Sequence, residues 1–305
     1  MSKKIVVVGS SNTDMIIKVP HVPVPGETII GGTFSIAAGG KGANQAVAAA
    51  RAGGDVTFVA RVGDDMFGEQ AKEGFVKDNI NVDHVLSDKG APSGVALIFV
   101  GEDGENSIAV ASGANANLSP SDIEAASESI SSADILIMQL ETPLDTVRKA
   151  ASIASENGVK VILNPAPAQP LSDDILKHVS ILTPNESESE ILTGLKVQAQ
   201  EDAAAAADAL MAKGIETVIV TMGAKGAFVV TADSKELVAG FSVKAVDATA
   251  AGDTFNGALA VALAEGKALK TAVSFANAAA ALSVTKLGAQ PSAPTREEID
   301  KFLGG

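Results

Sequence analysis

The segment "KAVDATAAGDTFNGALAVALAEG" (residues 244–266) places acidic, hydroxyl and glycine residues in front of a long apolar stretch. From Asp253 onward, apolar residues such as Leu259 and Leu263 recur at helical spacing, so we expect a helix that starts at Asp253 and stops at "AEG". A helix start gathers free backbone N–H groups and about half a positive charge, which attract an anion. Gly252 would let that anion approach the backbone closely. The alternative is that Asp253 is only the N-cap of the helix.

A second polar cluster, "SIAAGGKGANQAVAAARAG" (residues 35–53), places glycines on both sides of Lys41, and Asn44 falls at the start of another expected helix. The common nucleotide signatures are absent, because Lys41 is followed by glycine and no G-x-G-x-x-G follows the first strand. One glycine-rich turn is weak evidence for a site. Several such strand-to-helix junctions in one chain favour a binding site assembled from all of them.

Strand-like and helix-like segments alternate along the chain, as in "KKIVVVG" before "GANQAVAAARAG" and "ADILIMQL" before "PLDTVRKAASIASENG". The strands are continuously apolar, which indicates burial on both faces. We therefore predict an α/β fold, a three-layer and mostly parallel sheet flanked by helices. Ligands of such sheets bind beyond the carboxyl ends of the strands. The segment "EDAAAAADALMAKG" is expected to be a helix that Asp202 caps.

Two regions break this alternation. "MIIKV" and "ETIIGGTFSI" are strand-like with no helix between them, and "GVALIFVGEDGENSIAVASG" predicts a hairpin that turns at "GEDGEN". We expect one domain over residues 1–305, with strands of a small β-sheet lid inserted at about 14–37 and 94–112. Such strands would cover the site and provide the surface of a homodimer. The alternative is an antiparallel edge on the main sheet.

Composition narrows the choice of partners. The chain has 305 residues, 46% of them hydrophobic and 20% charged, with a net charge of −14, so nucleic acid and membrane surfaces are not expected as partners. It has no Cys and only three His (His21, His84 and His178), without ligand spacing. The first apolar run is shorter than a secretory h-region, and no run approaches the ~18 residues of a membrane span. We expect a cytoplasmic protein.

The glycine-containing segments "GGKGANQAVAAARAG" and "VDATAAGDTFNGALAVAL" resemble the two signatures of the ribokinase-type (phosphofructokinase B type) carbohydrate kinases. "SNTD", "MQLETP", "LNPAPA", "TPNESE", "TMGAKG" and "KLGAQPS" also occur in the family's order, so the resemblance covers essentially the whole chain. It implies ATP-dependent phosphorylation of D-ribose at its 5-hydroxyl. Alternatives are another free-sugar kinase of the family, such as a fructokinase or deoxyribokinase, or a sugar-binding regulator without turnover.

The resemblance also implies roles for particular residues. Asp253 would be the catalytic base, and the N–H groups of Ala251, Gly252 and Asp253 would form an anion hole. This suits phosphoryl transfer, in which a protein mainly positions groups and stabilises charge. The residues expected to hold the sugar hydroxyls are Asn12, Asp14, Gly40, Lys41, Asn44, Glu141 and Asp253.

Nucleotide and metal contacts follow from the same resemblance. The residues expected to bind ATP are Asn185, Glu188, Thr221, Gly223, Ala224, Lys225, Gly226, Gly252 and Asn277. Glu188 would also arrange Mg²⁺ indirectly, although "NESESE" is equally typical of an acidic helix start. The residues expected at a K⁺ site, mostly through main-chain carbonyls, are Asp247, Thr249, Ser283, Lys286, Gly288 and Ser292.

Overall fold

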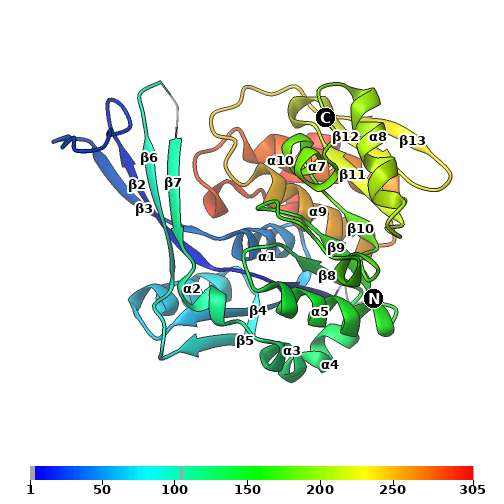
Figure 1. The fold of residues 1–305 in the computed structure, drawn as a ribbon, viewed down its shortest axis with the longest axis horizontal. Helices are drawn as coiled ribbons and strands as arrows, with labels where there is room; N and C mark the ends of the chain where they lie inside the picture. Colours follow the sequence, from blue (N-terminus) through cyan, green and yellow to red (C-terminus); the bar gives the residue numbers. More distant parts are fainter. Residues whose placement is uncertain (1–3, 104–105, 305) are drawn as a thin grey trace.

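The computed structural model describes residues 4–103 and 106–304. A nine-stranded main sheet with helices on both faces forms the body, and a separate four-stranded sheet projects from one side of it (Figure 1). The strands of the main sheet are β1 (Lys4–Val8), β4 (Asp55–Gly63), β5 (Asn81–Asp88), β8 (Ile135–Met138), β9 (Lys160–Leu163), β10 (Ile181–Leu182), β11 (Thr217–Thr221), β12 (Gly226–Val230) and β13 (Lys235–Ala239). Their order is β13-β12-β11-β10-β9-β8-β1-β4-β5. The predicted fold class is confirmed.

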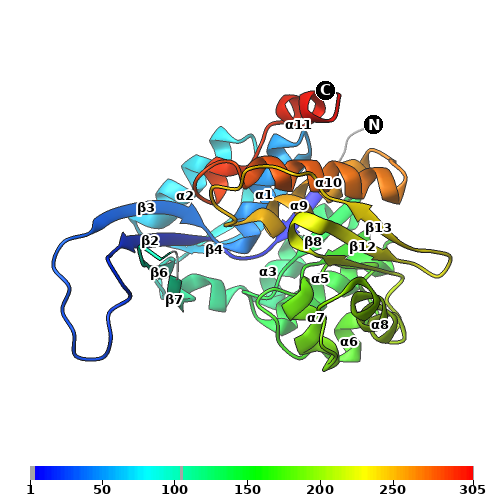
Figure 2. The ribbon, with the colours of Figure 1, turned by 90° about the horizontal axis from the view of Figure 1, so that it is seen from above.

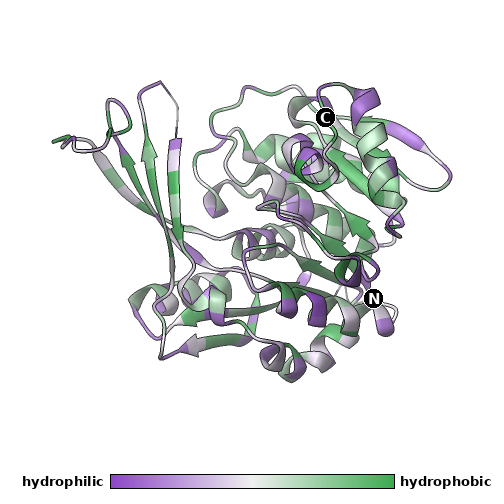
Figure 3. Cartoon of the chain, viewed as in Figure 1, coloured by the Kyte–Doolittle hydropathy of each residue, from purple (hydrophilic) through white to green (hydrophobic). Residues whose placement is uncertain are grey.

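The central strands separate two apolar cores. In β8, Ile135 and Ile137 pack into one core, while Leu136 and Met138 pack into the other. Because side chains alternate between the faces of a strand, a strand buried on both faces must be apolar throughout. Figure 3 shows the resulting hydrophobic interior, with polar residues gathered on the outer helices.

Helices cover both faces of the main sheet (Figure 2). One face packs against α1 (Lys41–Arg51), α2 (Met66–Lys77), α9 (Ala251–Ala264), α10 (Leu269–Ser283) and α11 (Arg296–Gly304). The other packs against α3 (Pro120–Ala125), α4 (Ser127–Ser131), α5 (Leu144–Glu156), α6 (Asp173–Leu176), α7 (Glu186–Thr193) and α8 (Gln200–Met211). Short 3-10 turns are η1 (Gly113–Asn117), η2 (Gly223–Lys225) and η3 (Gln290–Ser292). None of the helices within the described ranges is long and apolar enough to cross a membrane.

The sheet is parallel from β11 to β5 and antiparallel at β11–β12–β13. The strands β5, β12 and β13 are absent from the sequence-based prediction. The segment of β12, "GAFVV", directly follows the turn after β11, so chain reversal rather than a helix connects the two. The antiparallel edge therefore lies at the β13 side of the main sheet.

The small sheet contains β2 (Asn12–Lys18), β3 (Thr33–Gly39), β6 (Gly94–Val100) and β7 (Asn106–Ala111), in the order β3-β2-β6-β7. We call it the lid sheet. These strands form a sheet of their own, so the alternative of an added edge on the main sheet is wrong. Residues 27–32 of "ETIIGGTFSI" are not in a strand, which begins only at Thr33. The expected turn at "GEDGEN" includes residues 104 and 105, which lie outside the described residues.

Two helix starts differ from the prediction. The helix α9 begins at Ala251 rather than Asp253, because Ala250 adopts the left-handed conformation (φ 58°) and serves as the N-cap. Asp253 is therefore the third helical residue, and the N-cap alternative is wrong. Asp202 is likewise the third residue of α8, where its carboxylate accepts hydrogen bonds from the amides of Gln198 (3.0 Å) and Ala199 (2.9 Å). Both carboxylates lie in a first turn, where the helix dipole favours negative charge.

Candidate active site

The carboxyl ends of neighbouring parallel strands bring the polar segments together. Asn12 follows β1, Glu141 follows β8, Asn164 follows β9, Asn185 follows β10, and Thr221 ends β11. Because β11, β10, β9, β8 and β1 are neighbours in that order, these residues line one edge of the sheet. The helices α1 and α9 pack against each other, and both begin at this edge of the sheet.

Asp253 lies in the first turn of α9 and is 6% exposed. Its Oδ2 accepts a hydrogen bond from Nδ2 of Asn44 (3.0 Å), and its Oδ1 accepts one from Nε2 of Gln45 (2.9 Å). Both donors come from the first turns of α1. Close packing of the two helices makes this possible, since a Cβ added to Gly257 would lie 2.7 Å from the backbone oxygen of Gln45.

The environment of Asp253 perturbs its ionisation. Burial raises the pKa of its carboxyl above the ordinary value, while the charge of Lys41 and the two amide hydrogen bonds oppose that rise and Glu141 adds to it. A carboxylate with a raised pKa is a stronger base than an exposed aspartate. Asp253 is therefore a buried carboxylate whose pKa lies above that of an exposed aspartate.

The side chain of Glu141 is hydrogen-bonded to the backbone of Lys41 at the start of α1. Oε2 of Glu141 accepts a hydrogen bond from the amide of Lys41 (3.0 Å) and one from Oγ of Ser10 (2.5 Å). Gly40, which directly precedes Lys41, has a φ of 89°, and a Cβ at this position would lie 2.7 Å from the amide nitrogen of Asn12. Gly40 is thus required both by its conformation and by the approach of the strand beside it.

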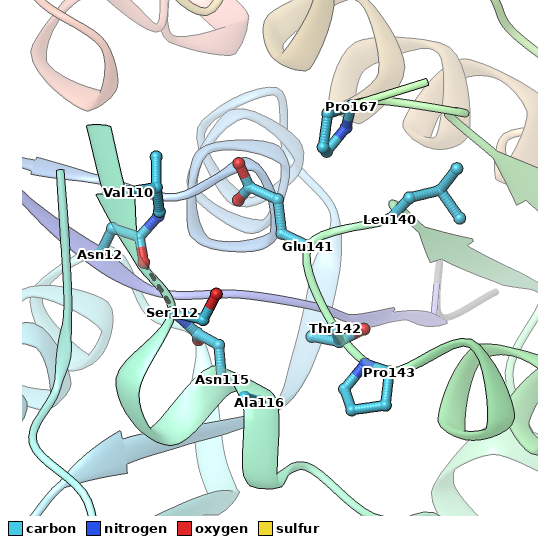
Figure 4. Close-up of a pocket in the computed structure, with 10 residues that line it drawn as sticks. All are labelled: Asn12, Val110, Ser112, Asn115, Ala116, Leu140, Glu141, Thr142, Pro143 and Pro167. Atoms are coloured by element: carbon cyan, nitrogen blue, oxygen red, sulfur yellow. Dashed lines mark hydrogen bonds between the residues drawn. The ribbon is translucent and has the colours of Figure 1, made fainter. Parts of the chain in front are cut away.

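Asn12 is oriented by Asn115, which is 1% exposed. Nδ2 of Asn115 donates to Oδ1 of Asn12 (2.7 Å) and to the carbonyl of Ser11 (3.1 Å), and its Oδ1 accepts from the amide of Ser11 (2.8 Å). Figure 4 shows the Asn12–Asn115 bond at the edge of a pocket. Because Oδ1 of Asn12 is engaged, its NH₂ group remains for a ligand oxygen.

Asp14 projects from β2 of the lid sheet. A Cβ added to Gly39 of the neighbouring strand would lie 2.3 Å from Oδ2 of Asp14, so Gly39 leaves the space for this carboxylate. Burial, with the nearby charges of Glu141 and Asp253, raises the pKa of Asp14 to about 6. Three carboxylates from the lid sheet and the body therefore influence one another electrostatically.

A pocket of 360 Å³ opens between η1 and the segment after β8 (Figure 4). Asn12, Ser112 and Glu141 form its polar side, and Leu140 and Pro167 belong to an apolar side. Its remaining lining residues are Val110, Asn115, Ala116, Thr142 and Pro143. A mixed polar and apolar lining of this kind suits a small polyhydroxylated ligand.

The start of α9 provides backbone donors. The amide of Thr254 makes the first intrahelical bond, to Ala250 (2.9 Å), and the amide of Ala251 donates to Ala248 (3.2 Å). The helix has no side-chain N-cap, which leaves the amides of Gly252 and Asp253 for another acceptor. A Cβ added to Gly252 meets nothing within 4 Å, so open space lies in front of this turn.

Asn185 and Glu188 form a capping box at the start of α7. The side chain of Asn185 accepts from the amide of Glu188, and that of Glu188 accepts from the amide of Asn185, both at 2.8 Å. The acidic helix start given as the alternative is thus present, and the structure adds a capping role that was not predicted. Burial raises the pKa of Glu188, Lys41 lowers it and Asp253 raises it, so Glu188 also belongs to the electrostatic environment of the base.

The loop after β11 has the conformation of a glycine turn. Gly223 (φ 53°) and Gly226 (φ 107°) bound η2, which also contains Ala224 and Lys225. Thr221 donates its amide to Pro184 (2.9 Å), which ties this loop to the start of α7. The loop therefore adjoins the capping box, as a continuous binding edge requires.

Asn277 lies on α10 and is 7% exposed. Its Nδ2 donates to the carbonyls of Val238 (3.0 Å) and Ala239 (3.2 Å). Its side chain thus attaches α10 to the edge strand β13. This structural contact is sufficient reason for an asparagine in an alanine-rich helix.

The residues predicted for K⁺ come from two adjacent loops. Asp247 joins them, because its carboxylate accepts from the amides of Thr249 (2.9 Å) and Gly288 (2.8 Å). Burial opposes ionisation of Asp247, but these hydrogen bonds prevail and lower its pKa. Lys286 pairs with Glu298 (2.8 Å).

The serine hydroxyls near these loops are also engaged. Oγ of Ser283 donates to Ala280 (2.9 Å), and Oγ of Ser292 donates to Ala289 (2.7 Å). Their hydroxyl protons are therefore committed within the protein. A cation here would depend chiefly on main-chain carbonyls and Asp247.

Sequence reasoning missed four buried amides beside the predicted residues: Gln45, Asn115, Gln139 and Asn164. Gln45 follows Asn44 directly, but a glutamine in an alanine-rich helix is typical of any helix. Asn164 occurs in "LNPAPA", a segment that contributes to the family resemblance but whose residue types do not indicate a contact for the asparagine. Their partners lie about a hundred or more residues away in the chain, so no local pattern indicates them.

The fold and this edge of the sheet define a carbohydrate kinase of the pfkB class. Residues 2–296 match the pfkB family carbohydrate kinases, and the chain belongs to this family. It is 50% identical to the ribokinase of Haemophilus influenzae over 303 residues, 99% of each chain. It is 40% identical to the deoxyribokinase of Salmonella typhi over 300 residues, 98% of each. The structure of Arabidopsis thaliana ribokinase complexed with ribose and ATP covers 100% of both chains, with a TM-score of 0.93 and 34% identity.

Proposed function

We propose that this protein is a ribokinase that transfers the γ-phosphoryl group of ATP to the 5-hydroxyl of D-ribose. The observation that carries the proposal is the position of Asp253. Its buried carboxylate is bonded to Asn44 and lies in the same helical turn as the amides of Gly252 and Asp253. A proton acceptor and an anion-binding turn then act on one reacting oxygen. The similarity to ribokinases of two kingdoms supports ribose as the acceptor.

The sugar would lie between the lid sheet and the body. Asn12 would donate a hydrogen bond through its NH₂ group, and Asp14 and Glu141 would accept hydrogen bonds from hydroxyl groups. Lys41, Asn44 and the backbone at Gly40 would complete the set. Hydroxyl groups need paired donors and acceptors, and leaving such partners unmatched in a buried site is costly. The 5-hydroxyl oxygen of the sugar would then attack the γ-phosphorus while its proton passes to Asp253. The bond from the γ-phosphorus to the bridging oxygen breaks, and ADP leaves.

ATP would lie across the ends of β10 and β11, with its phosphates toward α9. Thr221 and the glycine turn from Gly223 to Gly226, with Ala224 and Lys225, would bind the phosphates, and Asn277 would border the base. Within the described residues, no group of three or more acidic or histidine side chains could hold a metal ion. Mg²⁺ would therefore arrive with the phosphates and contact Glu188 through water. Bound Mg²⁺ neutralises phosphate charge.

A K⁺ ion would be held by Asp247 and the main-chain carbonyls of the two loops that this carboxylate joins. The donor set is all oxygen, which suits a hard monovalent cation. The residues that would contribute are Asp247, Thr249, Ser283, Lys286, Gly288 and Ser292. Bound K⁺ would add positive charge near the start of α9.

A homodimer through the lid sheet is part of the proposal. Phe34, Ile36 and Leu97 are 59%, 54% and 49% exposed, although all three are apolar. Strand alternation places them on the face opposite to Asp14, which pairs with Ala37 and Ala96. An apolar sheet face of this kind is a suitable surface for a second copy. Because the reaction consumes ATP, we place the protein in the cytoplasm.

A sugar-panel assay tests the activity. Purified protein with Mg²⁺ and ATP should release ADP fastest with D-ribose, more slowly with 2-deoxyribose and fructose, and faster with K⁺ than with a bulky monovalent cation. Preference for 2-deoxyribose would assign a deoxyribokinase instead. Sugar binding without ADP release would indicate a non-catalytic regulator and contradict the proposal.

A further inference from the structure

A chain of buried amides is hydrogen-bonded to Asp253. Gln45 is fully buried (0% exposed) and donates through Nε2 to Oδ1 of Asp253 (2.9 Å) and to Oδ1 of Asn164 (3.1 Å). Its Oε1 accepts from Nε2 of Gln139 (2.7 Å). Nδ2 of Asn164 donates in turn to the carbonyl of Thr183 (3.2 Å). The chain therefore connects α1, β8, β9 and α9.

These bonds permit only one orientation of the Gln45 amide. Its oxygen must face Gln139, which donates to it, and both of its N–H groups must then face the two acceptors. A reversed amide would direct an oxygen at the carboxylate of Asp253. The orientation is therefore fixed by buried partners and does not depend on substrate.

Gln139 is itself confined by the backbone. A Cβ added to Gly9 would lie 2.1 Å from Oε1 of Gln139, so a glycine at this position in the loop after β1 leaves the space for the amide. Oε1 of Gln139 has no hydrogen-bond partner among the described residues. The hydrogen bond that Gln139 makes within this chain is therefore the one from its NH₂ group to Gln45.

We propose that Gln45, oriented by Gln139, is the positioning residue of the catalytic base: it fixes Oδ1 of Asp253 from the buried side and leaves Oδ2, beside Asn44, as the atom that accepts the substrate proton. This assignment rests on the proposed kinase activity. Gln45 does not touch substrate and acts only through Asp253.

The hydrogen bond from Gln45 also favours the ionised form of Asp253. The other charged groups that act on this carboxylate are Lys41 from α1, Glu141 after β8, Asp14 from the lid sheet and Glu188 from α7. All of them remain when Gln45 is replaced. A change in the ionisation of Asp253 in such a variant therefore reports on the amide alone.

The test compares Gln45→Met and Gln139→Leu with the parent chain. For Gln45→Met we expect the acid limb of the kcat/KM profile to move up by about one pH unit, because a hydrogen bond to a charged group is lost. On the acid limb we expect kcat to fall by up to about tenfold and the Kd of ribose to change by less than about threefold. Gln139→Leu should also move the acid limb of the kcat/KM profile to higher pH, but by less than Gln45→Met.

Thr146→Val is the matched control. Thr146 is fully buried on α5 and donates to the carbonyl of Leu118 (2.6 Å), so its hydrogen bond involves none of the amides linked to Asp253. This variant should lower the thermal unfolding temperature without moving the acid limb. If Gln45→Met folds and the acid limb of its kcat/KM profile does not move, the proposal is overturned. If Gln45→Met does not fold, an unmoved acid limb in folded Gln139→Leu overturns it.

Carboxylate ¹³C NMR separates this inference from the proposed function. The signal of Asp253 is identified by its loss in Asp253→Asn, and its titration needs no turnover. If the parent chain phosphorylates no sugar, the proposed function fails, while an upward shift of this titration in Gln45→Met still supports the contact. If the parent chain is active and the titration does not move, the positioning role fails alone.

Discussion

At the scale of single residues, the site depends on one carboxylate whose two oxygens have different partners. In Asp253→Asn we expect kcat to fall by about 10²-fold or more, because the amide cannot accept the hydroxyl proton. Ribose should still bind, since Asn44 and the other sugar contacts remain. Steady-state ADP release and ribose titration calorimetry measure the two effects separately. Normal turnover by the variant would refute the role of Asp253 as the base.

Asp14 allows a prediction about stability and pH. Its pKa is about 6 in the folded protein and near 3.8 unfolded, so the folded state binds more protons between these values. Ionisation of Asp14 therefore lowers the free energy of unfolding as pH rises from about 3.8 through about 6. Asp14→Asn should stabilise the ligand-free protein at pH 7.5 by about 1 kcal/mol after solvent screening, and by less at pH 5.

Thermal unfolding at the two pH values measures this gain. Asp145→Asn is the control, because the side chain of Asp145 is 79% exposed and its replacement removes the same charge. The control should show no comparable rise in stability between pH 5 and pH 7.5. An equal gain for Asp14→Asn at both values would contradict the raised pKa.

At the scale of elements, two glycines of α9 have opposite surroundings. A Cβ at Gly252 meets nothing within 4 Å, whereas one at Gly257 would lie 2.7 Å from the amide of Ala49. Gly252→Ala should therefore keep or raise stability, by about 0.5–1 kcal/mol, and lower kcat/KM for ATP by about tenfold because the methyl group enters the space for phosphate.

Gly257→Ala is the matched comparison on the same helix. It should destabilise the fold by about 1–3 kcal/mol, because α1 and α9 must move apart. Urea unfolding measures the stability of both variants, and steady-state kinetics measure their kcat/KM for ATP. A large loss of stability in Gly252→Ala, or full activity in that variant, would show that the space before α9 is not used for phosphate.

The sequence predicts the elements of this site better than their contacts. The apolar periodicity of α9 was sufficient to predict the helix, but its first residue depends on the left-handed conformation of Ala250, which no residue-type rule indicates. The strands β12 and β13 were not predicted, and they follow β11 by chain reversal after "TMGAKG", without the intervening helix that the alternation of strands and helices leads one to look for. The contact of Gln45 with Asp253 joins residues 208 apart in the chain, so it depends on the packing of α1 against α9.

At the scale of the whole molecule, the lid sheet is the feature that we expect to control assembly. Replacement of Phe34 and Leu97 by lysine should convert a dimer to a monomer, because two charges would have to be buried against the partner's apolar face. Sedimentation velocity measures the change. Ile191→Lys is the control, since Ile191 is 59% exposed on α7 and lies outside the lid sheet. A monomeric parent chain, or a double variant that remains dimeric, would contradict the proposal.

The three acidic groups that interact electrostatically with one another should restrict which molecules this protein can phosphorylate. Asp14 reaches in from the lid sheet, and Glu141 and Asp253 from the body, with the ammonium group of Lys41 as the compensating charge among the residues that act on Asp253. An acceptor that already carried a phosphate would add two negative charges to this excess. The enzyme should therefore bind the unmodified sugar in preference to its phosphate ester, and repulsion should speed the release of the charged product.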